Sequence, residues 1–513
     1  MDDFRQKHLD TATKNKLTAA IAKWVATACR PVNVVEDEGL VDIIRIASND
    51  WTYELPSRAT ITSHVQKLHE AEKGKVQQAL EKTKAVTLTG DYWTSLSNHN
   101  YLGVTAHFFD PEWKLEPYAL TVMKTEERHC ADAVAEHFMK VAREWDIEHK
   151  VVSLTTDSAR NMIAAARQLP FEHMPCIAHS VHRAVTVSLT NSPFDNALAK
   201  CRKVVGHFKH SAANQAELEQ QQVAHHQKKE SLAQEVSTRW NSTLEMIKRV
   251  QWNAEPLRDA LALRATNVVM PTAAELEKLK KLEAVLDHCR YVSELLGGEK
   301  FVSCSAVLPA LCHLSRVMEV TEDDPAYMIK FKGIFAADME GRKEKTNTTW
   351  LRVATALDPR FKDLKCLSKP DRTEVWGTIR ALLQEMERPA QPDNQVTPEP
   401  PTKKPTLMLA HESSSDEEED SIEQCLEGYK AEPLTGMDDC PQEWWSAHEG
   451  AHSEMARLAR KYLAAPATSV PSERLFSVSG HVVQKKRASL LSENVNRLVC
   501  LSNWLKAKSS RLG

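Results

Sequence analysis

The sequence predicts an α/β region joined to a large all-α region, with a mixed β-sheet that a long helical insertion interrupts. Residues 83–185 contain short runs in which apolar and polar residues alternate, as in strands with one buried face. Residues 195–385 are instead rich in Glu, Gln, Lys, Leu and Ala and poor in Gly, which favours helices. A chain of 513 residues is too long for one ordinary domain, so two to four units are expected.

Residues 1–80 are predicted to form an N-terminal helical domain. Ile21 and Trp24 recur at helical spacing, and Pro31 and Pro56 interrupt the helical pattern. Several short helices are therefore expected before the first strand.

The strand pattern begins near residue 83. Residues 84–91 and 101–108 alternate, and the Ser-Asn-His-Asn cluster between them predicts a hairpin. Residues 118–123 form a third strand-like run, and 151–157 form a short buried strand after a helical pattern. The order β-β-β-α-β-α-β predicts a mixed sheet with helices on its faces, and 81–194 are assigned to this core.

Three segments are expected after the first part of the core. Residues 195–387 are assigned to the helical insertion domain. Residues 388–425 are Pro-rich and then acidic, so they bury too little apolar surface to fold and are predicted to be a disordered linker. Residues 426–513 are expected to be ordered again and to contain C-terminal helices. Residues 175–181 fit either a further strand or the start of a helix.

Composition excludes several classes of protein. No stretch approaches 18 apolar residues, so no membrane span is expected, and the first residues, MDDFRQKHLD, lack the apolar region of a secretory signal. The 11 cysteines are scattered without a C-x-x-C motif, which indicates reduced thiols and no ordinary zinc finger. An intracellular protein is expected.

The net charge of −4 gives no bulk basic field for nucleic acid. Any DNA contact must use local patches such as Lys485, Lys486 and Arg487. The alternative for this triplet is a solvated helix face.

Two aspartates occupy positions that suit metal chemistry. Asp91 is expected to follow the first strand and Asp157 to end the fourth. Enzymes that cut and join DNA strands use two divalent cations about 3.5–4 Å apart, held by carboxylates. Alternatively, each Asp forms a turn or caps a helix. No G-x-S-x-G, P-loop or G-x-G-x-x-G motif supports a hydrolase or phosphatase instead.

Six motifs resemble, in order, the blocks of hAT (hobo/Ac/Tam3) transposases. They are Gly90-Asp-Tyr-Trp-Thr-Ser95, Thr156-Asp-Ser-Ala-Arg-Asn-Met162, Cys176-Ile-Ala-His179, Arg239-Trp240-Asn241, Leu357-Asp-Pro-Arg-Phe-Lys362 and Pro471-Ser-Glu-Arg-Leu-Phe-Ser477. The resemblance extends from about residue 80 to 510 and is closest to the BED-zinc-finger transposase-derived group.

The resemblance implies an RNase H-like core and a DDE active site that cleaves DNA and transfers strands with Mg²⁺ or Mn²⁺. It also implies that residues 426–513 complete the core that the insertion interrupts. The acidic triad then corresponds to Asp91, Asp157 and Glu473. Glu473 is chosen only through the resemblance. Pro471 places it in the first turn of a helix, where a carboxylate is also favourable as a capping charge.

The resemblance also implies accessory DNA-binding residues. Cys176 and His179 are placed near the catalytic pocket, and Trp240, next to Arg239, stacks on an expelled base. A buried Trp is the alternative. With His182 the first pair forms C-x-x-H-x-x-H, but a fourth ligand is missing, so a packed histidine is favoured over zinc.

An apolar stripe near the C-terminus predicts an amphipathic helix. Its residues are Leu491, Val495, Leu498, Leu501 and Leu505. The stripe packs on its own domain, or it joins two chains, as the resemblance to the hAT dimerisation region implies. A homodimer or larger assembly is expected.

Residues 1–80 lack the Cys/His spacing of the BED finger that relatives carry. Two functions remain open. One is a nuclear, DNA-binding transposase that retains its DDE site. The other is a domesticated, non-catalytic dimerising regulator that recruits chromatin proteins.

Overall fold

The computed structural model describes residues 8–95, 98–127, 129–236, 239–263, 266–298, 304–344, 346–387, 414–483 and 491–509. These residues form two compact units. The sheet unit comprises Met1–Met174, Glu299–Cys304 and Ala356–Gly513, and the helical unit comprises Pro175–Gly298 and Ser305–Thr355. Among the described helices, none is both long and apolar enough to cross a membrane.

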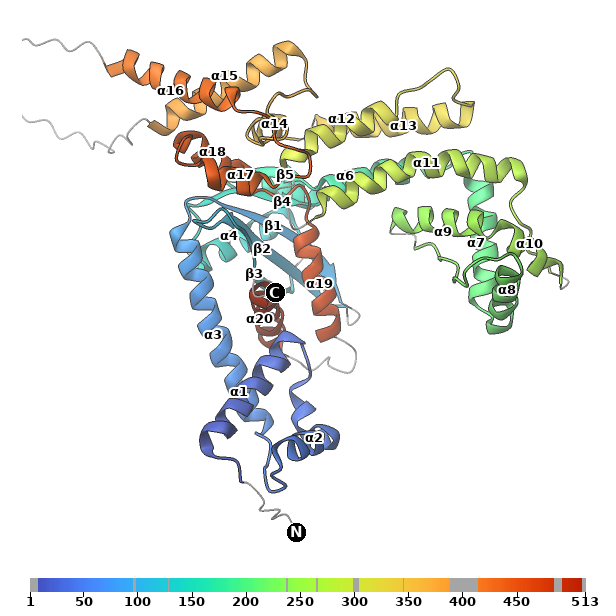
Figure 1. Ribbon diagram of the computed structural model, residues 1–513, viewed down its shortest axis with the longest axis horizontal. Helices are drawn as coiled ribbons and strands as arrows, with labels where there is room; N and C mark the ends of the chain where they lie inside the picture. The colour runs from blue at the N-terminus through green and yellow to red at the C-terminus, as the bar shows by residue number, and fades with distance from the viewer. Residues whose placement is uncertain are drawn as a thin grey trace, which may run out of the picture. The chain divides into compact units, whose positions relative to one another are not determined.

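A five-stranded mixed sheet lies at the centre of the sheet unit (Figure 1). Its strands are β1 (Val86–Thr94), β2 (Asn100–Phe109), β3 (Leu115–Thr125), β4 (Val151–Thr156) and β5 (Glu172–Pro175), in the order β3-β2-β1-β4-β5. The first three strands are antiparallel and β4 is parallel to β1, so the predicted mixed sheet is confirmed. One detail was wrong: β1 continues to Thr94, so Asp91 lies within the strand and not after it.

Different segments of the chain pack on the two faces of the sheet. On one face, α4 (Ala131–Glu144) packs so closely that a Cβ atom on Gly90 would lie 2.3 Å from Cε1 of Phe138. On the other face, the hydroxyl groups of Thr87 and Thr155 donate hydrogen bonds to the carbonyls of Ala464 (3.0 Å) and Pro466 (2.9 Å). The chain therefore returns to this second face after the helical insertion.

Helix α20 (Ser492–Ser509) covers the outer edge of β3, which is an edge strand of the sheet (Figure 1). The Oδ1 atom of Asn503 accepts a hydrogen bond from the main-chain N–H of Ala119, and the indole N–H of Trp504 donates to the carbonyl of the same residue, both at 2.9 Å. Side chains of α20 thus bind main-chain groups that an edge strand leaves unpaired.

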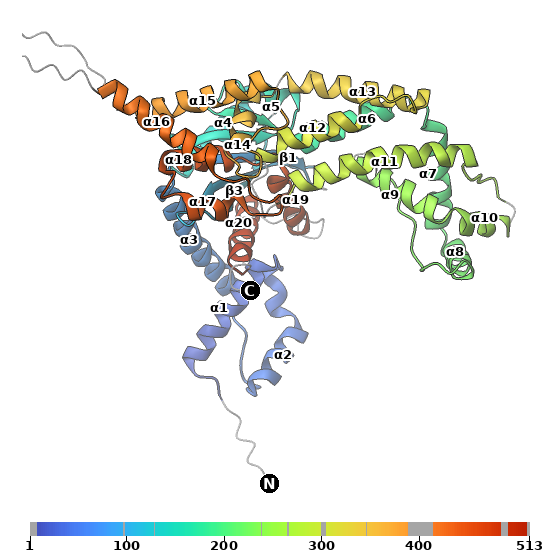
Figure 2. The ribbon, with the colours of Figure 1, turned by 45° about the horizontal axis from the view of Figure 1, so that its top comes forward.

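The N-terminal helices are drawn in blue in Figure 2: α1 (Thr11–Thr27), the short 3₁₀ helix η1 (Val32–Glu36), α2 (Glu38–Ser48) and α3 (Arg58–Lys82). Side chains of α1, η1 and α3 belong to the same hydrophobic core as the sheet, whereas α2 has no buried residue. Pro31 and Pro56 lie between helices, as predicted. The hydroxyl of Ser502 in α20 donates to the carbonyl of Thr27 in α1 at 2.9 Å, so these helices are part of the sheet unit and not a separate domain.

Four helices near the acidic segment complete the sheet unit: α15 (Lys369–Glu387), α16 (Ser414–Ala431), α17 (Pro441–His448) and α18 (Ser453–Leu463). The prediction of a disordered linker over 388–425 was wrong for its last part, because α16 begins at Ser414. Buried Ile422, Leu426 and Tyr429 form an apolar stripe that anchors this helix. Residues 388–413 lie outside the described residues.

The helical unit consists of long helices packed side by side. It contains α6 (Ile177–Leu189), α7 (Asp195–Lys209), α8 (Ala212–Ala224), α9 (Trp240–Trp252), α10 (Ala254–Ala262), α11 (Ala273–Leu296), α12 (Val307–Val317) and α13 (Ala326–Lys343), with α14 (Thr348–Ala356) at its boundary. Figure 1 shows α6 running alongside α11. The unit begins earlier and ends earlier than the predicted 195–387, since α15 packs with α16 and α18 in the sheet unit.

Candidate active site

Asp91 lies on the sheet face that faces away from α4. It pairs with Gly103 of β2, and directly paired residues of antiparallel strands point to the same face. A Cβ atom on Gly103 would lie 2.9 Å from Cε1 of Phe476 and 3.6 Å from the carbonyl oxygen of Ser472. The first turns of α19 (Val470–Val482) therefore lie over the strand position opposite Asp91.

Asp157 is the first residue after the neighbouring strand β4. In the parallel β1–β4 pair, Thr89 is opposite Thr155, and each aspartate follows two residues later in the chain. Asp157 therefore lies near the level of Asp91, and its charge acts on Asp91. The sheet thus brings together two of the three predicted carboxylates.

Glu473 completes the group from α19. It lies in the first turn of the helix, where the hydroxyl of Ser469 donates a hydrogen bond to its Oε1 atom at 3.3 Å. It immediately follows Ser472, whose carbonyl oxygen lies near Gly103. After the helical insertion, α19 therefore brings a third carboxylate to the sheet face that carries Asp91.

The electrostatics of Asp91 place the three acids in one site. Burial raises the pKa of Asp91 to about 8, and the negative charges of Asp157 and Glu473 add to this effect. The N–H of Tyr92 opposes it by donating a 2.8 Å hydrogen bond to Oδ1. Nearby like charges disfavour ionisation, so Asp157 and Glu473 act in the same direction as burial, which is the larger cause.

The carboxylates are close but are not arranged as ready ligands. Within the described ranges, no three His, Cys, Asp or Glu side chains are placed to hold one metal ion. Asp157 Oδ1 accepts a hydrogen bond from the N–H of Ala159 at 3.1 Å. The all-oxygen donor set nevertheless suits Mg²⁺ or Mn²⁺.

His173 is a neighbour of this site that the sequence did not indicate. Its Nε2 atom lies 2.9 Å from Oγ1 of Thr156, the residue before Asp157. Burial lowers the pKa of His173, although the charge of Asp157 opposes the shift. A neutral imidazole is therefore expected beside Asp157 at neutral pH. A single histidine in a four-residue strand carries no spacing signal that would reveal it.

Cys176 and His179 belong to the helical unit. Cys176 is only 1% exposed and caps α6, with its Sγ atom accepting a hydrogen bond from the N–H of His179 at 3.4 Å. The Cys176 side chain is thus covered by its own unit, and its contact with DNA stays a prediction. The ring of His179 lies 6.0 Å from that of His182. A DNA contact by His179 stays a prediction.

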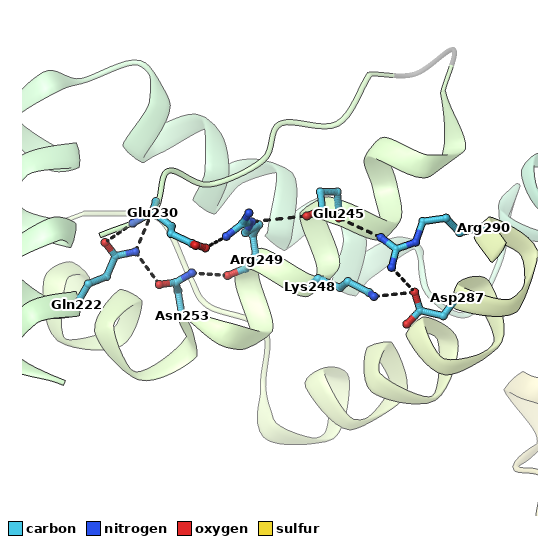
Figure 3. A network of polar contacts seen from close by, with 8 residues as sticks. All are labelled: Gln222, Glu230, Glu245, Lys248, Arg249, Asn253, Asp287 and Arg290. Carbon is cyan, nitrogen blue, oxygen red and sulfur yellow. Dashed lines mark hydrogen bonds and ion pairs between the residues drawn. The ribbon is translucent and has the colours of Figure 1, made fainter. Parts of the chain in front are cut away.

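Trp240 is buried, which fits the alternative for this residue, and its stacking on a base stays a prediction. Trp240 is the first residue of α9 and is 7% exposed, so its flat face is covered by the helical unit. Arg239 is exposed. Further along α9, Arg249 is paired with Glu230 and Glu245, as Figure 3 shows. These paired charges offer DNA little net positive charge.

The predicted dimerisation stripe is mostly internal. Val495, Leu498, Leu501 and Leu505 are buried in the core that α20 shares with the sheet, whereas Leu491 is 71% exposed. The stripe therefore packs on its own domain, and a contact of these residues with a second chain stays a prediction. The basic triplet Lys485, Lys486 and Arg487 lies outside the described residues.

Family comparisons agree with this organisation. The ZBED1 RNase-like domain matches residues 89–176, and the ZBED1 RNase-like helical domain matches residues 174–285. The hAT family C-terminal dimerisation region matches residues 425–505, which include Glu473. These three segments of the chain are therefore similar to ZBED1 RNase-like domains and to the hAT dimerisation region. Its RNase-like core, helical insertion and C-terminal region are those that the sequence motifs indicated.

The similar proteins carry names that describe different roles. It is 24% identical to "Putative AC transposase" of Zea mays, over 93% of this chain and 63% of the relative. It is 21% identical to "Zinc finger BED domain-containing protein 6" of Mus musculus (96% and 55%) and 20% identical to "Putative transcriptional regulator tpeD" of Talaromyces stipitatus (93% and 60%). The chain thus spans less than two thirds of the length of these relatives.

Proposed function

We propose that this chain binds DNA and cleaves and transfers DNA strands with Asp91, Asp157 and Glu473 as its metal-binding carboxylates. The observation that supports this proposal is geometric: Asp91 is paired with Gly103 on the sheet face that the first turn of α19 covers, and Glu473 lies in that turn. The charges of Asp157 and Glu473 both act on Asp91, and a group of carboxylates of this kind is typical of sites that bind cations. DNA is the proposed substrate, and the nucleus is the proposed location.

The chain's own residues divide the work. Asp91 is held rigidly within the central strand of the sheet, and Asp157 lies beside it at the end of β4. Glu473 lies on α19. The segment just before this helix is hydrogen-bonded to the same face of the sheet through the carbonyls of Ala464 and Pro466. Divalent cations bound there would activate the attacking oxygen and stabilise the leaving oxygen. Asp91 must lose its proton before it serves as a ligand.

Cleavage of DNA by the purified chain in Mg²⁺ or Mn²⁺ tests the proposal. We expect nicked or hairpin-ended products that disappear in Asp91→Asn, Asp157→Ala and Glu473→Gln. Glu493→Gln is a matched control, because this exposed acid lies on α20, outside the site. Equal activity after Asp157→Ala would exclude these carboxylates as the catalytic site.

The second candidate is a non-catalytic dimerising protein that regulates transcription and recruits chromatin proteins. It is favoured by the match of residues 425–505 to the hAT family C-terminal dimerisation region and by the similarity to a relative named a putative transcriptional regulator. This candidate predicts self-association without metal-dependent cleavage. Sedimentation of the full chain tests it, and a monomer at micromolar concentration would count against it.

A further inference from the structure

Two histidines meet on the helical unit, in the part of the chain that the proposed function does not use. His288 of α11 and His313 of α12 share a hydrogen bond in which Nδ1 of His288 lies 3.1 Å from Nε2 of His313. Their ring centroids lie 5.0 Å apart. His288 is exposed and His313 is half-buried, so solvent and solutes reach the pair.

The separation of these nitrogens matches that of two ligands on one metal ion. Zinc–imidazole bonds are about 2.0–2.1 Å long, so two of them at tetrahedral or right angles place their nitrogens about 2.8–3.4 Å apart. Imidazole is a preferred ligand of zinc, copper and nickel ions. A neutral ring is required for binding, and burial together with the neighbouring His288 lowers the pKa of His313.

We propose that His288 and His313 form a two-histidine site for a divalent transition-metal ion of the zinc, nickel or copper class, which joins α11 to α12. Water completes the coordination. Asp287 precedes His288, but its Oδ1 atom is engaged by Nζ of Lys248 at 2.6 Å and by Arg290 at 2.9 Å (Figure 3). This carboxylate therefore does not serve as a third ligand.

Nearby groups limit the strength of the site. The charge of Arg316 acts on His313 from the next turn of α12, and the ring of Tyr291 lies 6.5 Å from that of His313. Because the site has two protein ligands and lies near the positive charge of Arg316, the ion binds reversibly and links the two helices. The nitrogen donors also distinguish this site from the all-oxygen set around Asp91, which suits harder cations.

Nickel titration of the full chain by calorimetry at pH 7.5 tests the proposal. We expect that His288→Ala and His313→Ala each weaken the tightest binding event by more than about tenfold. His225→Ala is the matched control, because this exposed histidine of the same unit pairs with Asp259. It should bind nickel as the wild type does.

Two further measurements separate the outcomes. In wild-type protein, nickel should slow hydrogen exchange in α11 and α12, and Asp157→Ala should leave that protection intact because the carboxylates take no part. Unchanged nickel affinity in the His288→Ala/His313→Ala double variant, or protection confined to the sheet unit, would overturn the proposal. The proposal would also be overturned if nickel gave the wild type no protection and Asp157→Ala abolished nickel binding.

Discussion

The side-chain Oδ1 atom of Asn496 accepts a hydrogen bond from the main-chain N–H of Val122 at 2.8 Å, across 374 residues of sequence. Asn503 makes the equivalent bond to Ala119, two helical turns further along α20. Asparagine side chains on one face of a helix thus bind the main chain of β3 where another strand would otherwise add.

Asn496→Ala is expected to destabilise the chain by about 1–3 kcal/mol, because the N–H of Val122 loses its partner while it stays part-buried. Asn494→Ala is the control, since that amide contacts Arg497 on the helix and not the sheet. Urea denaturation of both variants measures the difference. Equal midpoints would show that water replaces Asn496 without cost.

Gly103→Ala is expected to reduce metal-dependent activity more than Gly74→Ala. The new Cβ atom at residue 103 would lie 2.9 Å from Phe476 and displace α19, which carries Glu473. At Gly74, in the middle of α3, no atom lies within 4 Å of an added Cβ, so alanine should stabilise the helix by about 0.5–1 kcal/mol. Full activity in Gly103→Ala would show that the position of α19 is not critical.

The pH dependence of stability should reveal the proton on Asp91. Its pKa in the folded chain is about 8, above the ordinary value of 3.8, so folding takes up a proton between these values. The contribution of this group is fully present below about pH 4 and is lost as pH rises through 8. In EDTA, the Tm of the wild type should therefore fall more than that of Asp91→Asn between pH 6 and 9. Parallel curves for the two proteins would contradict the burial of this acid.

Lys362→Ala is expected to destabilise the sheet unit by about 1–3 kcal/mol. Lys362 is 4% exposed, and its ammonium group donates to the carbonyls of Tyr429, at 2.7 Å, and Glu432, at the end of α16. Lys365→Ala is a matched control, because that side chain is 77% exposed. Thermal unfolding followed by circular dichroism compares them, and similar losses in both would exclude a specific role for Lys362.

The sheet could be predicted because its strands carry their own signals. Alternating residues with a turn cluster between them give β1 and β2, and Asp91 and Asp157 follow from their places on strands. Glu473 could not be derived in this way. Locally it is a carboxylate in the first turn of a helix, and only the fold brings it to strands more than 300 residues earlier.

The sequence was ambiguous where one residue pattern is compatible with two structures. The apolar stripe of α20 fits a partner chain or the chain's own core, and only packing shows that Leu498 and Leu501 are internal. In α16, the acidic composition of residues 412–421 outweighed a short stripe that starts at Ile422 and continues through Leu426 and Tyr429 at spacings of four and three. Three well-spaced apolar residues were sufficient to fix the helix.

The cover that α20 provides has a consequence for biosynthesis. A ribosome adds about 5–20 residues per second, so the 374 residues between Val122 and Asn496 take about 20 to 75 s to make. Throughout that interval the nascent sheet has an open edge at β3, which is vulnerable to pairing with other chains. Translation arrested before α20 should therefore yield aggregation-prone polypeptide, and chaperones that bind extended strands should be needed most while the helical insertion is being synthesised.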